Sequence, residues 1–296
     1  MNKALETAQK LQHFAKYHLK RRVFDYPAPE TAMGIESFDY DREEFSKDLL
    51  SYADRFDIRE LSAMHYQSKA YPMYRVRTGT PDAKHRVLVL SAVHGNEYAG
   101  LYAVPKLLQD IVDNPDDYAD AAVSIITPVN PVGAAHNSRY NGSGFDINRD
   151  FLRQETREAR AVAEEVEAFA PQFVVSLHEG PQDAGAFIFT NRLVSTDAAH
   201  EVLRHMQQGG TDMAKKDYFG RTLKPRGYAP TGPIGAGLNF LWIKLLGMMT
   251  MAAYAEVNGL PEVTLETPWR SADRDGRINT HVQVIKGAVS SLRAGA

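Results

Sequence analysis

Cysteine is absent from the 296 residues of this chain. The absence excludes disulfide bonds and cysteine-ligated metals, so a bound metal ion would have to be held by histidine and carboxylate side chains. A chain without disulfides also suits a reducing compartment, and we expect a cytoplasmic protein.

A basic excess and a long apolar run are missing as well. The net charge is −3, whereas a nucleic-acid surface requires clustered Lys and Arg. The longest apolar candidate, residues 238–253, is interrupted by Asn239, Lys244 and Gly247 and falls short of a membrane span. The basic residues 1–22 predict an amphipathic helix packed on the domain rather than a signal peptide. We therefore expect neither a nucleic-acid nor a membrane partner.

Hydrophobic residues make up 44% of the chain, enough for one sizeable core. We predict a single domain over residues 1–296, with residues 1–80 as an N-terminal helical and strand extension packed on it. Apolar runs typical of strands buried on both faces occur at residues 87–93, 121–127, 173–177 and 262–265.

Helical periodicity separates these runs. Predicted helices cover residues 42–56, 98–112, 155–169, 196–216, 237–246 and 282–293, and short strands are predicted at 74–77 and 187–189. Strands separated by helices predict right-handed crossovers and a largely parallel sheet, covered on both faces.

Polar residues follow the apolar runs at the point where each predicted strand ends. His94, Asn130, His178 and Glu266 each stand at or just beyond such an end. The carboxyl ends of parallel strands meet at one edge of a sheet, where binding sites form. The sequence therefore predicts one shared site.

His94, Glu97 and His178 supply two imidazoles and a carboxylate, an established ligand set for a catalytic zinc that keeps a fourth position open for water. Each residue alone is weak evidence: a lone His after a strand is more often hydrogen-bonded than a ligand, and helix starts favour Glu in any case. Glu179 is adjacent to His178 but should point the opposite way in an extended strand. The combination, not one residue, predicts the metal site.

A turn-rich block at residues 130–151 presents Arg139 and Arg149, whose planar donor forks suit carboxylates. We expect Asp146 and Asp150 to pair with these arginines as structural residues. Glu266 ends a buried strand and needs a partner. It is either a salt-bridge residue or a general base.

Together these segments resemble the zinc carboxypeptidase family. The resemblance rests on His94-Gly95-Asn96-Glu97, on the block from Asn130-Pro131-Val132-Gly133 to Asp146-Ile147-Asn148-Arg149-Asp150-Phe151, on Ser176-Leu177-His178, and on Glu266. It covers roughly residues 85 to 270. It implies an α/β fold with a mixed, mostly parallel central sheet of about eight strands and helices on both faces.

The resemblance also implies the roles of the residues. One Zn²⁺ would be bound by His94, Glu97 and His178, and the catalytic residues would be Glu266, as general base, and Arg139, which polarises the scissile carbonyl. The substrate-binding residues would be Arg139, Asn148 and Arg149. A substrate-side tyrosine is expected between His178 and Glu266, and the candidates considered are Tyr228 and then Tyr254.

Our first hypothesis is a metallocarboxypeptidase acting on small peptides with a free carboxylate. Asn96 stands where digestive carboxypeptidases commonly have Arg, and His-Gly-Asn-Glu is typical of the related succinylglutamate desuccinylase and aspartoacylase group. The alternative is therefore an N-acyl amino acid deacylase. A non-catalytic binding module is the third hypothesis, and the presence of Glu266 with all three ligands argues against it.

Overall fold

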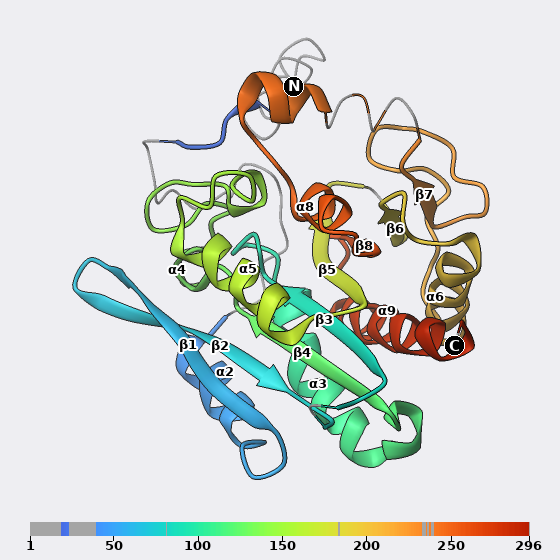
Figure 1. The fold of residues 1–296 in the computed structure, drawn as a ribbon, viewed down its shortest axis with the longest axis horizontal. Coiled ribbons are helices and arrows are strands. Elements are labelled where there is room, and N and C mark those ends of the chain that lie inside the picture. Colours follow the sequence, from blue (N-terminus) through green and yellow to red (C-terminus); the bar gives the residue numbers. More distant parts are fainter. Residues whose placement is uncertain are drawn as a thin grey trace.

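The computed structural model describes residues 19–23 and 40–295, except residues 81, 183, 233, 234, 236, 238 and 239. Its centre is one eight-stranded sheet with the strand order β1-β2-β4-β3-β5-β8-β6-β7 (Figure 1). The strands are β1 (Asp57–Tyr66), β2 (Lys69–Arg77), β3 (His85–Ser91), β4 (Ala121–Thr127), β5 (Phe173–Gly180), β6 (Phe187–Thr190), β7 (Tyr228–Pro230) and β8 (Glu262–Pro268).

The middle of the sheet is parallel. Strands β4, β3, β5 and β8 run in one direction, while β2 pairs antiparallel with β4 and β6 pairs antiparallel with β8. The prediction of a mixed, mostly parallel sheet of about eight strands is confirmed. The division into one domain with an extension over residues 1–80 stays a prediction, although β1 and β2 form one edge of this same sheet.

Helices cover both faces of the sheet (Figure 1). They are α2 (Arg42–Leu50), α3 (Ala99–Asp113), α4 (Pro131–Ala135), α5 (Arg157–Phe169), α6 (Thr196–Gln208), α8 (Met251–Val257) and α9 (Arg274–Ala294). Among the described residues, no helix is both long enough and apolar enough to span a bilayer.

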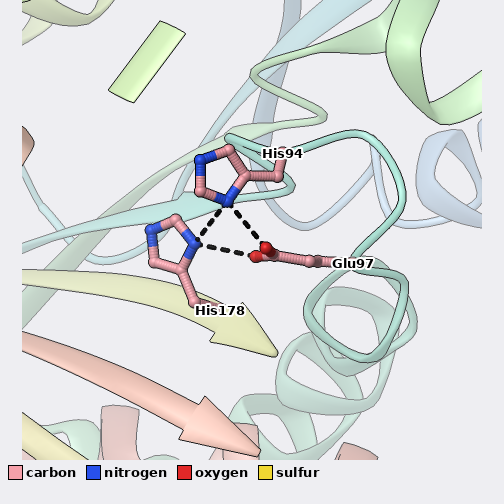
Figure 2. A group of neighbouring side chains, drawn as sticks. All are labelled: His94, Glu97 and His178. Carbon is pink, nitrogen blue, oxygen red and sulfur yellow. Dashed lines mark hydrogen bonds and ion pairs between the residues drawn. The ribbon is translucent and has the colours of Figure 1, made fainter. Parts of the chain in front are cut away.

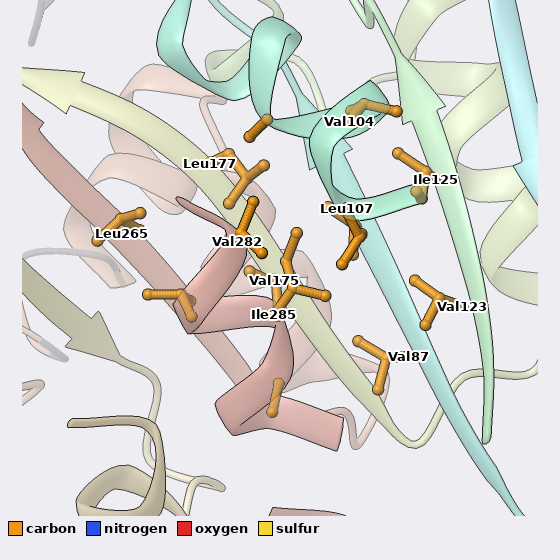
Figure 3. Close-up of a cluster of buried hydrophobic side chains, with 14 of the residues drawn as sticks. Val87, Val104, Leu107, Val123, Ile125, Val175, Leu177, Leu265, Val282 and Ile285 are labelled. Carbon is orange, nitrogen blue, oxygen red and sulfur yellow. The ribbon is translucent and has the colours of Figure 1, made fainter. Parts of the chain in front are cut away.

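One face of the sheet is packed with apolar side chains against α3 and α9. Figure 3 shows this cluster, in which Val175 and Leu177 of β5 and Leu265 of β8 meet residues of both helices. A second cluster lies on the opposite face and includes Val174 of β5 and Met251 of α8. Because side chains alternate along a strand, Ser176 and His178 lie on this second face together with Val174.

Three helix predictions were wrong in extent. The helix predicted over residues 42–56 ends earlier, at Leu50. The helix predicted over residues 196–216 ends at Gln208, because Gly209 and Gly210 follow it and Gly210 has a positive φ of 81°. The helix predicted over residues 282–293 begins earlier, at Arg274, where the side chain of Asp273 accepts a hydrogen bond from the Gly276 amide.

Two other regions were not resolved by the sequence patterns. Strand β1 was not predicted, because as an edge strand it is largely exposed or only partly buried and lacks a regular apolar alternation. Of the helix predicted over residues 237–246, the structure describes a short helical turn at Trp242–Leu246. Most of the helix predicted over residues 1–22 lies outside the described residues.

Candidate metal centre and active site

Three strand ends bring the predicted site residues together. His94 follows β3 by three residues, and His178 lies within β5. Glu266 lies on the neighbouring strand β8, directly opposite His178 in the strand register. His94 and Glu266 are 172 positions apart in the chain. They lie with His178 at one edge of the sheet because β3, β5 and β8 are parallel neighbours.

His94, Glu97 and His178 form a compact, buried cluster (Figure 2). The Glu97 carboxylate lies 2.7 Å from Nδ1 of each histidine, and the two Nδ1 atoms are 3.1 Å apart. Both histidines and the carboxylate therefore aim one ligand atom at a common point, and all three atoms fall within 4.8 Å of one another. This donor set fits a metal ion of the kind that zinc enzymes bind.

Burial and the neighbouring charges shift the pKa values of Glu97 and His178 within this cluster. The two histidines hold the pKa of Glu97 well below its usual range despite complete burial, which acts in the opposite direction. Burial lowers the pKa of His178, which favours the neutral imidazole that a metal requires.

The loop after β3 owes its shape to a close contact between two glycines. A Cβ atom at Gly95 would lie 2.0 Å from the carbonyl carbon of Gly133, so no larger residue fits without moving the backbone. Ala92, at the start of the loop, has a positive φ of 51°, an uncommon conformation that turns the chain sharply at the strand end. The segments that contain Gly95 and Gly133 are thus in close backbone contact, which fixes the positions of His94 and Glu97.

The block at residues 130–151 holds Arg139 beside the cluster. The Asn130 side chain caps α4 by accepting from the Gly133 amide, and its Nδ2 donates to the Arg139 carbonyl. Nε and Nη2 of Arg139 lie 2.9 and 2.8 Å from Oδ2 of Asp146, and its Nη1 lies 3.2 Å from Nδ1 of His94. The guanidinium is therefore held beside the cluster of His94, Glu97 and His178.

Asp146 pairs with an arginine of the block, as expected, whereas Asp150 has other partners. Arg139 and Arg149 hold the pKa of the buried Asp146 well below its usual range. Asp150 instead lies 3.4 Å from Arg21 and accepts from the Thr156 amide at 2.7 Å. The expectation for Asp150 was wrong because its carboxylate anchors the following loop, not an arginine of the block.

Arg149 is buried under the ring of Trp242, with its guanidinium carbon 5.2 Å from the ring centroid. Burial lowers its pKa, and the nearby Asp146 opposes that effect. Asn148 uses its side-chain oxygen to accept from the Met251 amide at the start of α8. The NH₂ group of Asn148 is then the part of the side chain that is suited to a carboxylate.

Glu266 lies on the same face of the sheet as His178. Burial, and after it the charge of Glu97, raise the pKa of Glu266 well above its usual range, while Arg139 acts in the opposite direction. A Cβ atom at Gly180 would lie 2.8 Å from Oε2 of Glu266, so the glycine leaves room for this carboxylate. Burial therefore favours the protonated form of this carboxyl.

Tyr218 is the residue of this region that the sequence analysis missed. The same Cβ at Gly180 would lie 3.3 Å from Cδ1 of Tyr218. The tyrosine interacts electrostatically with Glu266, Arg149 and Arg139. Burial and the Glu266 carboxylate raise its pKa well above the usual range.

The two tyrosines considered from the sequence lie elsewhere. Tyr228 is on β7 beside His200, and Tyr254 is on α8 beside Phe151. A substrate-side role for either tyrosine stays a prediction. Tyr218 stands in a turn, where no periodicity marks the direction of a side chain, and only the tertiary structure shows its position.

Glu179 points away from the cluster, as expected from strand alternation. Its carboxylate receives hydrogen bonds from Arg277 of α9 and from the Ala99 amide of α3, both on the opposite face of the sheet. Its backbone amide, however, donates to Oε2 of Glu97 at 3.2 Å. Glu179 thus contributes to the position of Glu97 through its main chain.

The fold is that of the metallocarboxypeptidases. A metallo-carboxypeptidase from Burkholderia cenocepacia matches with a TM-score of 0.65 at 15% identity, over 87% of this chain and 70% of its own. One from Pseudomonas aeruginosa, in complex with (2-guanidinoethylmercapto)succinic acid, matches with a TM-score of 0.61 at 18% identity, over 86% of this chain and 70% of its own. These likenesses define the scaffold.

The model of a family described as "Protein of unknown function (DUF2817)" matches residues 36–222, and the chain belongs to that family. A 100-residue segment is 32% identical to carboxypeptidase 2 of Trichophyton rubrum. That segment is 32% of this chain and 19% of the relative, so the chain matches about a fifth of the length of this curated relative.

Proposed function

We propose that the protein is a zinc-dependent hydrolase that cleaves an amide bond next to a free carboxylate, as a metallocarboxypeptidase acting on small peptides. The observation that carries the proposal is the buried convergence of His94, Glu97 and His178 with Glu266 on the next strand. The scaffold and the relatives named carboxypeptidases support it.

In this proposal His94, Glu97 and His178 hold one Zn²⁺. When bound, zinc lowers the pKa of a coordinated water from 15.7 toward about 7 and polarises a carbonyl group. Glu97 is ionised and His178 favours its neutral form, so these two ligands are already in the protonation states that coordination requires.

Glu266 is the proposed proton carrier. It accepts a proton as the nucleophile forms and passes that proton to the nitrogen of the departing amine. Its burial beside Glu97 raises its affinity for a proton, and Arg139 limits the rise. A carboxyl whose pKa is raised in this way is suited to take up a proton and to return it.

Arg139 and Arg149 are the proposed substrate residues, together with Asn148. Arg139 lies against His94 and would donate to the carbonyl oxygen as it gains negative charge. Arg149, with the NH₂ group of Asn148, would bind the terminal carboxylate, which orients the substrate without taking part in the chemistry. Tyr218 lies close enough to Glu266 to contact a bound substrate.

Asn96 supports a second candidate function, that of an N-acyl amino acid deacylase. Asn96 is buried between the two ligands His94 and Glu97, and the alternative uses the same metal cluster and the same base. The two functions differ in whether the scissile amide joins a C-terminal amino acid or an acyl cap.

A hydrolysis screen of the zinc-loaded protein on dipeptides, cell-wall peptides and N-acyl amino acids tests the proposal. We expect turnover of peptides with a free terminal carboxylate, and none of the same peptides after amidation. Turnover of N-acyl amino acids alone would assign the deacylase function. No turnover in any class by a zinc-loaded, folded protein would contradict both candidates.

A further inference from the structure

A buried carboxylate outside the proposed chemistry begins strand β8. Glu262 has no exposed surface, its Oε1 accepts from Oγ1 of Thr264 at 2.8 Å, and its Oε2 has no hydrogen-bond partner among the described residues. No ion pair with a described residue neutralises it, and burial raises its pKa to about 7. An unpaired buried carboxyl is costly, so its presence calls for a partner.

Glu262 lies on the same face of the sheet as the proposed active site. Side chains alternate along a strand, so Glu262, Thr264 and Glu266 of β8 project to one side. Their register partners in β5 include Ser176 and His178 on that same side. The Ser176 hydroxyl moderates the rise in the pKa of Glu262, but it too lacks a partner with good hydrogen-bond geometry among the described residues. A polar stripe therefore runs from the base Glu266 to Glu262.

Solvent reaches the middle of this stripe. Thr264 is the one residue of β8 that is not buried, although β8 lies between β5 and β6 inside the sheet. Its register partner in β6, Phe189, is also partly exposed, whereas the residues on either side of Phe189 are buried. The partly exposed residues Thr264 and Phe189 thus lie between the proposed base Glu266 and the buried Glu262.

Helix α8 links the proposed carboxylate anchor to the side of β8 that bears the stripe. Asn148 is hydrogen-bonded to the first residue of α8, and α8 packs against β8. Arg149 and Asn148 therefore stand at the start of the helix that covers the same side of the strand. A residue whose carboxylate binds Arg149 and whose amide lies at Glu266 would have its side chain beside the stripe.

We propose that Glu262, together with Ser176 and Thr264, selects substrates in which the residue with the free carboxylate bears a long basic side chain, an ammonium or a guanidinium. The proposal rests on the proposed function for the position of that residue. Four residues of strand span about 13 Å, a distance that a long side chain and the Glu262 side chain bridge together. A cation there would satisfy both Oε2 of Glu262 and the Ser176 hydroxyl, whereas an apolar side chain leaves them unpaired.

The test compares kcat/KM for N-blocked dipeptides that share the penultimate residue and end in Lys, Arg, Leu or Glu. We expect the basic substrates to exceed Leu by about 10- to 100-fold, as for a charge-assisted hydrogen bond in a buried site. Glu262→Gln should remove most of that preference and leave kcat/KM for the Leu substrate within about twofold. Glu256→Gln removes a carboxylate of α8 that pairs with Arg192 and should leave the preference intact.

Failure of this inference is distinguishable from failure of the proposed function. Cleavage of Leu substrates with no preference for Lys or Arg would overturn the role of Glu262 and leave the peptidase assignment standing. If no peptide is cleaved, calorimetry on the zinc-free Glu266→Gln protein tests the inference by comparing the affinities for Lys- and norleucine-terminated dipeptides. These two peptides differ in the cation alone. Equal affinity for the two overturns the inference, whereas tighter binding of the Lys peptide that is lost on adding Glu262→Gln supports it.

Discussion

The two faces of strands β5 and β8 differ in the kind of side chain that they bear. On one face Val175, Leu177, Val263 and Leu265 join the apolar cluster with α3 and α9. On the other face the alternate residues are Ser176, His178, Glu262, Thr264 and Glu266. The same two strands thus supply an apolar core on one side and, on the other, the proposed metal ligand His178 and the proposed base Glu266.

This difference shows how a functional surface can be built into buried strands. A strand covered on both faces is expected to be apolar at every position, and each polar residue within it must find a partner or a function. His178 contacts Glu97, and Glu266 lies among charged groups. Glu262 accepts one hydrogen bond, and its Oε2 has no partner among the described residues. The apolar face supplies the rigidity that holds these groups in place.

The largest contrast is expected between His178 and its neighbour Leu177. His178→Ala removes a proposed ligand, so we expect loss of bound zinc and of activity with a small change in the stability of the zinc-free protein. Leu177→Ala should instead lower the free energy of unfolding by about 2–5 kcal/mol and retain zinc. Elemental analysis and thermal unfolding of both variants check this, and full zinc retention by the His178 variant would refute the ligand assignment.

The next contrast concerns Glu266 and Leu265. Glu266→Gln keeps the shape of the side chain but cannot take up a proton, so we expect a zinc-loaded, folded protein whose kcat falls by about 10²–10⁴. Leu265→Ala should lose stability and keep most of its kcat below the unfolding temperature. Turnover near the wild-type level in the Gln variant would remove Glu266 from the mechanism.

The sequence predicted the polar face better than it predicted its surroundings. His94, His178 and Glu266 could be located because each follows or ends an apolar run, and Glu97 because it stands three residues after His94. The order of the parallel strands then places them at one edge of the sheet. Their spacing along the chain is set by crossovers, which any parallel sheet requires.

Other parts of the site depend on tertiary contacts that local patterns do not encode. Tyr218 approaches Gly180 from a turn, and Asp150 pairs with Arg21, which is 129 positions away in the chain. Glu262 was assigned to a strand from its sequence, but its lack of a partner becomes visible only once the neighbouring side chains are known.

Two buried arginines provide a smaller, more selective test of the comparison. Arg149 lies on the polar side under Trp242, whereas Arg277 pairs with Glu179 on the apolar side. We expect Arg149→Ala to raise KM about 10- to 100-fold for substrates with a free carboxylate and to change kcat little. Arg277→Met should instead act on stability, because it leaves the buried Glu179 unpaired.

Kinetics on matched free-acid and amidated substrates separate the two effects. An equal loss on amidated substrates in the Arg149 variant would contradict its role as the carboxylate anchor. An Arg277 variant that is fully stable but raises KM to the same extent would show that the two faces are not functionally distinct.

The last effect is a pH dependence of stability that originates on the polar face and develops gradually over the pH range. Burial raises the pKa of Glu262 from 4.5 to about 7, so between these values the folded protein keeps a proton that the unfolded chain releases. Stability is therefore lost as the pH rises through this window, by up to about 3 kcal/mol. Glu262→Gln cannot ionise, so its Tm relative to the wild type should increase from pH 5 to pH 8. A difference in Tm that stays constant over this range would show that Glu262 already has a partner for its charge, and the polar face would then need no cation from a substrate.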